Sequence, residues 1–112
     1  MKYSDVEYYG KKEEIGGCYI YRKINHDKFI LKQIGRHSPD GFQWGYGGSG
    51  PAETALCILL DFVKLFNIKD IDGDFVEQNY QKFKWDFISS IKGDLKINGN
   101  DINNWLKDVK NN

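Results

Sequence analysis

The first third of the chain alternates apolar and polar residues with the period of a β-strand. The alternation runs over residues 3–9, 18–24 and 29–34, and side chains two positions apart lie on the same face of a strand. Turn-forming residues separate these runs, as at Asn25. Short turns between successive strands favour antiparallel pairing. The pattern therefore predicts an antiparallel β-meander in this part of the chain.

From Pro51 onward the apolar period becomes that of an α-helix. Proline fits the first position of a helix, and Glu53 in the first turn would suit the helix dipole. Apolar residues then recur at intervals of three and four as far as Phe66. Additional apolar residues at Ile58 and Leu60 widen the stripe, so we expect this helix to be covered on more than one side.

Two further helices are predicted in the C-terminal half. Asp74 and Glu77 have the spacing of a capping box at the start of the second helix. Asn100 or Asp101 is expected to cap the last one. The short apolar segment 95–97 lies between these two helices and could pair with the sheet.

Strands followed by helices are typical of an α+β fold, here a small antiparallel β-sheet packed against two to three C-terminal helices. A chain of 112 residues is long enough for one core and too short for two. We therefore predict a single domain over residues 1–112. It comprises the β-meander (1–35), a loop rich in glycine and aromatic residues (36–51) and a helical part (51–110).

Charge and composition exclude several classes of protein. Sixteen basic and 16 acidic residues give a formal net charge of zero, which argues against a protein that coats nucleic acid and against a nucleic acid duplex as partner. No apolar run has the length of a membrane span, and the first residues lack a signal-peptide pattern, so we expect no membrane partner and a cytoplasmic location. Three Trp and seven Tyr leave a homo-oligomer open.

Cys18 and Cys57 are the only cysteines, and no Cys-x-x-Cys spacing is present. We interpret both as reduced thiols and expect neither a metal site nor a cofactor. A calcium loop beginning at Asp70 is also excluded, because its sixth and twelfth positions hold Phe75 and Gln81.

The most informative segment is residues 36–51, which contain five glycines, three aromatic residues and an Arg-His pair directly before the first helix. Residues 45–50 match the G-x-G-x-x-G pattern of dinucleotide-binding proteins. The match lacks the flanking parallel strands of that fold, and no lysine follows the last glycine as a P-loop requires. A weaker interpretation remains, in which backbone amides of the loop and of the helix N-terminus form an anion site.

This interpretation gives a set of candidate ligand-binding residues. Arg36 and His37 could bind phosphate, with Ser38 and Asp40 bonding sugar hydroxyls, and an accessible aromatic ring could stack on a base. The alternative is that the glycines only give the backbone room beside the sheet. The candidate set is Arg36, His37, Trp44, Tyr46, Gly47, Gly48, Ser49 and Gly50.

Catalysis has little support in the sequence. Ser49 and His37 could form a nucleophile and base, but Gly47-Gly48-Ser49-Gly50 is not a G-x-S-x-G elbow. No spaced pair of carboxylates lies beside the loop. We therefore predict no catalytic residues and expect a binding protein instead of an enzyme.

The run from His37 to Ala52, followed by an apolar helix, resembles the domain-of-unknown-function family 6166 of bacterial, phage and plasmid proteins. Phe83-Lys84-Trp85 and the later Ile102, Trp105 and Leu106 resemble its C-terminal half. The resemblance covers roughly residues 30–108. It implies a small accessory protein of mobile elements and no established activity.

These observations lead to three functional hypotheses. The first is an anti-defence sponge that binds and sequesters a small phosphate-bearing nucleotide signal, of the cyclic dinucleotide or ADP-ribose type. The second is a protein-interaction module that inhibits a host defence protein through exposed aromatic residues. The third is a nucleotide hydrolase that uses His37.

Overall fold

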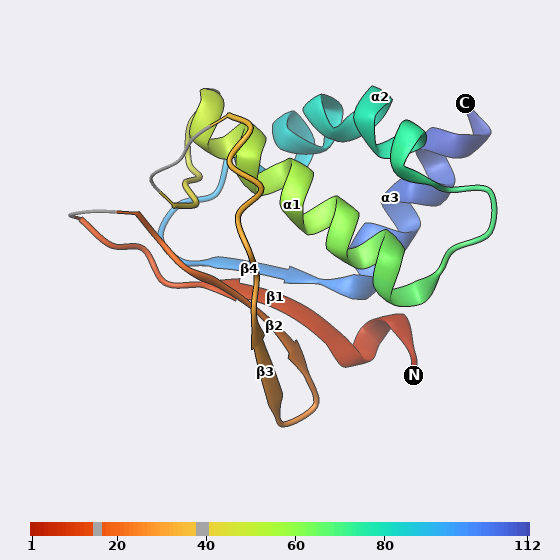
Figure 1. The fold of residues 1–112 in the computed structure, drawn as a ribbon, viewed down its shortest axis with the longest axis horizontal. Coiled ribbons are helices and arrows are strands. Elements are labelled where there is room, and N and C mark those ends of the chain that lie inside the picture. Colours follow the sequence, from red (N-terminus) through yellow and green to blue (C-terminus); the bar gives the residue numbers. More distant parts are fainter. Residues whose placement is uncertain (15–16, 38–40) are drawn as a thin grey trace.

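A computed structural model describes residues 1–14, 17–37 and 41–112 (Figure 1). The predicted α+β fold is confirmed: a four-stranded antiparallel sheet carries three α-helices on one side. The sheet order is β3-β2-β1-β4. The strands are β1 (Val6–Gly10), β2 (Ile20–Ile24), β3 (Asp27–Ile30) and β4 (Leu95–Asn98).

The central strand β1 shows why the sheet has one covered face. Val6 and Tyr8 are fully buried against the helices, whereas Glu7 and Tyr9, which alternate with them along the strand, are only partly buried. β1 pairs with β2 on one side and with β4 on the other. The segment predicted at 95–97 therefore completes the sheet, although it lies far away in the sequence.

All three strands of the meander differ in their bounds from the prediction, and β3 covers Asp27–Ile30 in place of residues 29–34. Residues Tyr3–Asp5 form a 3-10 turn, η1, so the first strand begins at Val6. Cys18 precedes β2 and forms an isolated bridge with Phe42, with backbone hydrogen bonds of 3.1 and 3.0 Å. This bridge joins the segment before β2 to the loop of residues 36–51, called here the glycine-rich run. The alternation pattern alone does not show this contact.

The helices are α1 (Ser49–Phe66), α2 (Gly73–Phe83) and α3 (Gly99–Asn111). α1 crosses the molecule between the sheet and α2 (Figure 1). Every residue from Gly50 to Leu59 is buried, which matches the widened apolar stripe. The helix begins at Ser49, earlier than Pro51, so Glu53 lies beyond the first turn and faces the interior.

The helix caps lie two or three residues before the predicted ones. Asp72, with φ −120°, accepts the amide of Phe75 and caps α2, whereas Asp74 already lies within the helix. Asn98 accepts the amide of Asn100 at 2.8 Å and caps α3. Only a residue with extended backbone can turn its side chain back to the first free amides, and this condition selects Asp72 and Asn98.

α2 continues directly into η2 (Lys84–Ile88), a turn of π-helix. A π-turn carries one more residue per turn than an α-helix and changes which side chains share a face. Here it buries Lys84 and leaves Trp85 60% exposed. Both residues lie beside the glycine-rich run that precedes α1.

Candidate functional site

Trp44 belongs to the core. Its side chain is fully buried, and its indole N–H donates to the carbonyl of Gly93 at 2.7 Å. Stacking on a ligand requires an accessible ring face, so the stacking role predicted for Trp44 is not kept. The alternation of Phe42, Trp44 and Tyr46 places the first two rings inward and leaves only Tyr46 at the surface, 47% exposed.

Two exposed aromatic rings cover residues 45–48, the turn between Trp44 and α1 that we call the glycine turn. A Cβ added at Gly47 would collide with the ring of Trp85, and one added at Gly48 would collide with the ring of Tyr46. These glycines are therefore needed for close approach of the rings. Gly45 has φ +91°, a conformation that favours glycine, and its amide donates to the carbonyl of Ile88 at 3.1 Å. The turn thus packs against η2.

Gly50 and Ser49 occupy different environments at the start of α1. Gly50 is buried against Gln43, whose side chain also accepts a hydrogen bond from the Tyr46 hydroxyl. Ser49 is exposed. The N-cap is Gly48, which has no side chain to bond the first amides of the helix. The N-terminus of α1 therefore carries its partial positive charge without a side-chain acceptor.

Two lysines hold carbonyl groups of the same turn. Lys84 Nζ donates to the carbonyl of Gly47 at 3.3 Å and lies 4.3 Å from the centre of the Trp85 ring. Lys12 Nζ donates to the carbonyl of Trp44 at 2.9 Å. Lys84 is only 7% exposed, and no described carboxylate lies within ion-pair distance of it. A nearly buried lysine without a counter-charge is unusual, because burying a charge without one is costly.

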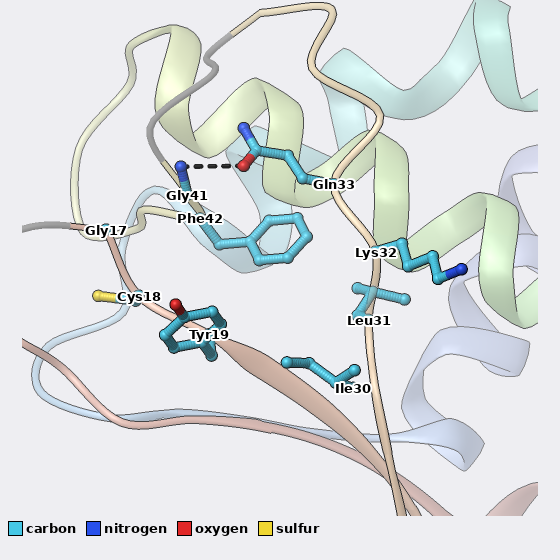
Figure 2. Close-up of a pocket in the computed structure, with 9 residues that line it drawn as sticks. All are labelled: Gly17, Cys18, Tyr19, Ile30, Leu31, Lys32, Gln33, Gly41 and Phe42. Carbon is cyan, nitrogen blue, oxygen red and sulfur yellow. Dashed lines mark hydrogen bonds between the residues drawn. The ribbon is translucent and has the colours of Figure 1, made fainter.

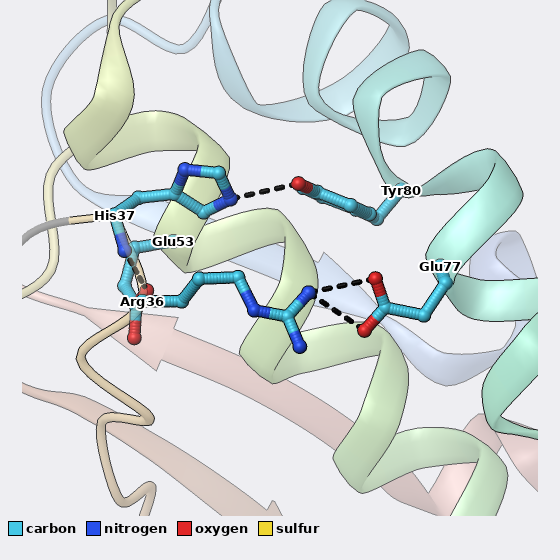
Figure 3. A network of polar contacts seen from close by, with 5 residues as sticks. All are labelled: Arg36, His37, Glu53, Glu77 and Tyr80. Carbon is cyan, nitrogen blue, oxygen red and sulfur yellow. Dashed lines mark hydrogen bonds and ion pairs between the residues drawn. The ribbon is translucent and has the colours of Figure 1, made fainter.

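Arg36 makes an ion pair within the protein (Figure 3). Its NH1 atom lies 2.6 and 2.7 Å from the two carboxylate oxygens of Glu77 on α2. The hydrogen bond to Glu77 raises the pKa of Arg36. Glu77 therefore occupies the guanidinium that we predicted would bind phosphate.

His37 is held by two neighbouring helices. Its backbone amide donates to Glu53 on α1 at 2.9 Å, and its Nε2 lies 2.7 Å from the hydroxyl of Tyr80 on α2 (Figure 3). The Gly35 amide donates to the other oxygen of Glu53 at 2.5 Å. We call the set Gly35, Arg36, His37, Glu53, Glu77 and Tyr80 the polar clamp. It fastens the chain before the glycine turn to α1 and α2.

Glu53 is the buried centre of this clamp. Burial alone would raise its pKa, but the amides of His37 and Gly35 together with the Cys57 thiol outweigh that effect and lower it. Burial raises the pKa of Cys57 to about 12. Cys57 is therefore a neutral thiol at physiological pH, not a thiolate nucleophile.

The predicted site residues thus separate into two groups. Arg36 and His37 lie in the polar clamp, while Tyr46, Gly47, Gly48 and Ser49 form a surface with residues of η2. Ser38 and Asp40, assigned to sugar hydroxyls, lie outside the described residues. The sequence reasoning did not include Lys84 or Trp85. One signal could have found them, since Trp85 falls off the apolar face of its helix.

A hollow lies elsewhere, between the end of β3 and the glycine-rich run (Figure 2). Its volume is about 580 Å³, and Tyr19, Leu31 and Phe42 contribute to its walls. Gln33 accepts the Gly41 amide at 2.9 Å, and the other end of its carboxamide is buried without a described partner. None of the predicted ligand-binding residues lines this hollow.

Within the described ranges, no group of three or more His, Cys, Asp or Glu side chains could hold a metal ion. Across those ranges, no helix has the length and apolarity that crossing a bilayer requires. Both cysteines are buried and free.

Comparison with known proteins gives one match. A family model described as a family of unknown function, DUF6166, matches residues 8–108. No curated protein and no solved structure matches the chain. The matched segment includes most of the sheet, the whole glycine-rich run and nearly all of the helical part. The chain therefore belongs to this family of unknown function, DUF6166.

Proposed function

We propose that this chain is a binding protein that sequesters a small phosphate-bearing nucleotide at the glycine turn. The observation that carries the proposal is the position of Lys84. The residue is nearly buried, its ammonium bonds the neutral carbonyl of Gly47, and Gly47 directly precedes the glycine N-cap of α1. An anion at this place would meet two positive groups, and it would supply the charge that Lys84 lacks among the described residues.

The two exposed rings supply the second half of the recognition. Tyr46 and Trp85 flank the turn, with 47% and 60% of their surface exposed. Stacking of a base on such a ring contributes about 1–3 kcal/mol. In this proposal the phosphate lies against Lys84 and the first amides of α1, and the base stacks on Tyr46 or Trp85. Trp85 thus takes the role first assigned to Trp44.

The proposed role requires binding and no chemistry. Cys57 is a protonated thiol, and His37 is committed to Tyr80 and Glu53. On a mobile element, a protein of this kind would withdraw a cyclic dinucleotide or an ADP-ribose-type signal from a host defence system. This setting comes from the sequence resemblance and remains part of the proposal.

Titration calorimetry with a panel of cyclic dinucleotides and cyclic ADP-ribose isomers tests the proposal. We expect at least one nucleotide to bind, and Lys84→Met to weaken that binding about tenfold or more, as the loss of a charged contact does. Lys82→Met is the matched control. Lys82 lies two positions away, is exposed and pairs with Asp86, so its replacement should leave binding unchanged.

Two results would count against this function. One is the absence of heat with every nucleotide, and the other is equal binding by the Lys84→Met variant and the native chain. Chromatography of the same mixtures checks for products. A product would instead favour the hydrolase hypothesis.

A second candidate, the protein-interaction module, is favoured by the apolar edge at β3. Tyr19, Phe29, Ile30 and Ile34 are between 48% and 66% exposed, and β3 is an edge strand of the sheet. The hollow of about 580 Å³ and a second one of about 440 Å³ share Ile30 in this region. Exposed apolar edge strands are common docking sites for a partner chain.

Titration with a purified host defence enzyme distinguishes this candidate. Binding that Phe29→Ser abolishes and Lys84→Met preserves would support the interaction module and place the partner at the β3 edge. Binding that only Lys84→Met weakens would exclude that edge as the docking site.

A further inference from the structure

The sheet face opposite the helices carries an ordered grid of side chains. Strand register places Lys96, Tyr9, Tyr21 and Ile30 in one row across all four strands. The next row contains Asn98, Glu7, Lys23 and Lys28. Val6, Tyr8, Leu95 and Ile97 alternate with these residues and face the helices, where they are buried. In Figure 1 the helices lie on that other side, and no described helix covers the grid.

Three tyrosines surround a shallow hollow on this open face. Tyr9 and Tyr21 are direct cross-strand partners, and Tyr19 joins them around a volume of about 260 Å³. Lys23 Nζ lies 4.2 Å from the centre of the Tyr9 ring, and Lys28 Nζ lies 5.9 Å from that of Tyr21. These ammonium groups therefore lie over the tyrosine rings, and a base that stacked on a ring would displace the lysine toward the phosphate of the same nucleotide.

We propose that this open face, distinct from the glycine turn, binds a short single-stranded nucleic acid. The supporting argument is charge complementarity combined with aromatic spacing. Four cationic side chains lie on or beside the face (Lys11, Lys23, Lys28 and Lys96), against two carboxylates (Glu7 and Glu13). The zero net charge of the whole chain conceals this local excess. Tyr19 is 66% exposed and Tyr9 and Tyr21 are partly exposed, so rings on this face could stack on unpaired bases, whereas a duplex keeps its bases inside and gives the tyrosines nothing to stack on.

Fluorescence anisotropy with labelled oligothymidylate and oligouridylate of about ten nucleotides tests this proposal. We expect binding that weakens with salt, with a slope of log K against log salt of roughly −2 for three phosphate contacts. The double variant Tyr9→Leu, Tyr21→Leu should weaken binding about tenfold or more. Its matched control is Tyr46→Leu, a tyrosine on the glycine turn, and circular dichroism checks that each variant remains folded.

Failure of this proposal is separable from failure of the nucleotide proposal. Lys84→Met should leave oligonucleotide binding unchanged, and the double tyrosine variant should leave nucleotide binding unchanged. The proposal is overturned if neither oligonucleotide binds, if a duplex of equal length binds as well, or if the folded double variant binds like the native chain. Binding of a protein at this face in place of the oligonucleotides would overturn it as well.

Discussion

The two halves of the glycine-rich run differ in how their polar groups are satisfied. The half that contains Arg36 and His37 is tied to α1 and α2, with a described partner for each charged group of the polar clamp. The half that contains Tyr46 to Ser49 presents exposed rings, a glycine N-cap and the nearly buried ammonium of Lys84. The two regions lie within one short stretch of sequence.

The comparison shows that residue type alone does not separate scaffold from site. An arginine next to a histidine suggests phosphate binding, yet here Arg36 pairs with Glu77 and His37 contacts Tyr80 within the protein. A lysine in the middle of a helix suggests a solvated surface, yet Lys84 is the charge without a described counter-ion. Buried charges are normally paired with an opposite charge, so a buried lysine without a described counter-charge is the more informative residue.

The largest expected effect is at Trp44. Trp44→Ala removes a fully buried ring whose indole N–H bonds the Gly93 carbonyl. We expect the free energy of unfolding to fall by about 3–5 kcal/mol, measured by urea denaturation. Trp85→Ala is the control, since that ring is 60% exposed. A Trp44→Ala variant as stable as Trp85→Ala would contradict the core assignment.

Glu53 in the polar clamp should come next. Glu53→Ala leaves the amides of Gly35 and His37 without their acceptor, and each buried unsatisfied donor costs about 1–3 kcal/mol. We expect a total loss of about 3 kcal/mol in the same denaturation assay. Glu77→Ala at the exposed edge of the clamp should cost much less. Equal losses for the two variants would show that the clamp has no buried centre.

Acid should weaken the polar clamp. The pKa of Glu53 is lowered from its ordinary value of 4.5, so the folded chain holds this proton less tightly than the unfolded chain. Its stabilising contribution is complete above that value and is lost as the pH falls through the folded-state pKa. The Trp105 indole and Lys82 lower the pKa of Asp86 in the same direction. We expect unfolding free energy to decline below about pH 4.5, and less steeply in Glu53→Gln.

Lys84→Met should weaken nucleotide binding without lowering the stability of the fold. Replacing a nearly buried lysine that lacks a counter-charge by Met removes a desolvation cost while it keeps most of the packing. We therefore expect Lys84→Met to be as stable as the native chain or up to about 1 kcal/mol more stable by thermal unfolding. A loss of more than this amount would mean that the bond to the Gly47 carbonyl is a structural staple.

The fold was largely predictable because it depends on periodicity. Alternation gave the strands, and the apolar stripe of α1 gave a helix covered on several sides. The cap positions were less accessible, because Asp72, Asp74, Asn98 and Asn100 are all suitable residue types and only backbone geometry chooses among them. Pairing of β4 with β1 was named as a possibility but could not be required by local pattern.

The site was less predictable because its residues are distant in sequence. Arg36 and Glu77, or Gly47 and Trp85, are brought together only by the packing of α2 and η2 against α1. The π-turn at η2 also shifts which residues of the helix face inward. Helical periodicity does not predict such a turn, so Lys84 could not be recognised as buried from sequence.

The smallest effect is expected at Arg36, and it distinguishes the two halves of the run most directly. The Arg36–Glu77 pair lies at the surface, with side-chain exposures of 45% and 44%, and exposed ion pairs contribute little to stability. Arg36→Ala should therefore leave the urea midpoint nearly unchanged. If nucleotide is held at the glycine turn, Arg36→Ala should also leave the calorimetric affinity unchanged, whereas Lys84→Met weakens it. Loss of nucleotide affinity in Arg36→Ala with no loss of stability would instead mean that the ligand competes with Glu77 for the guanidinium, and the polar clamp would then be part of the binding site.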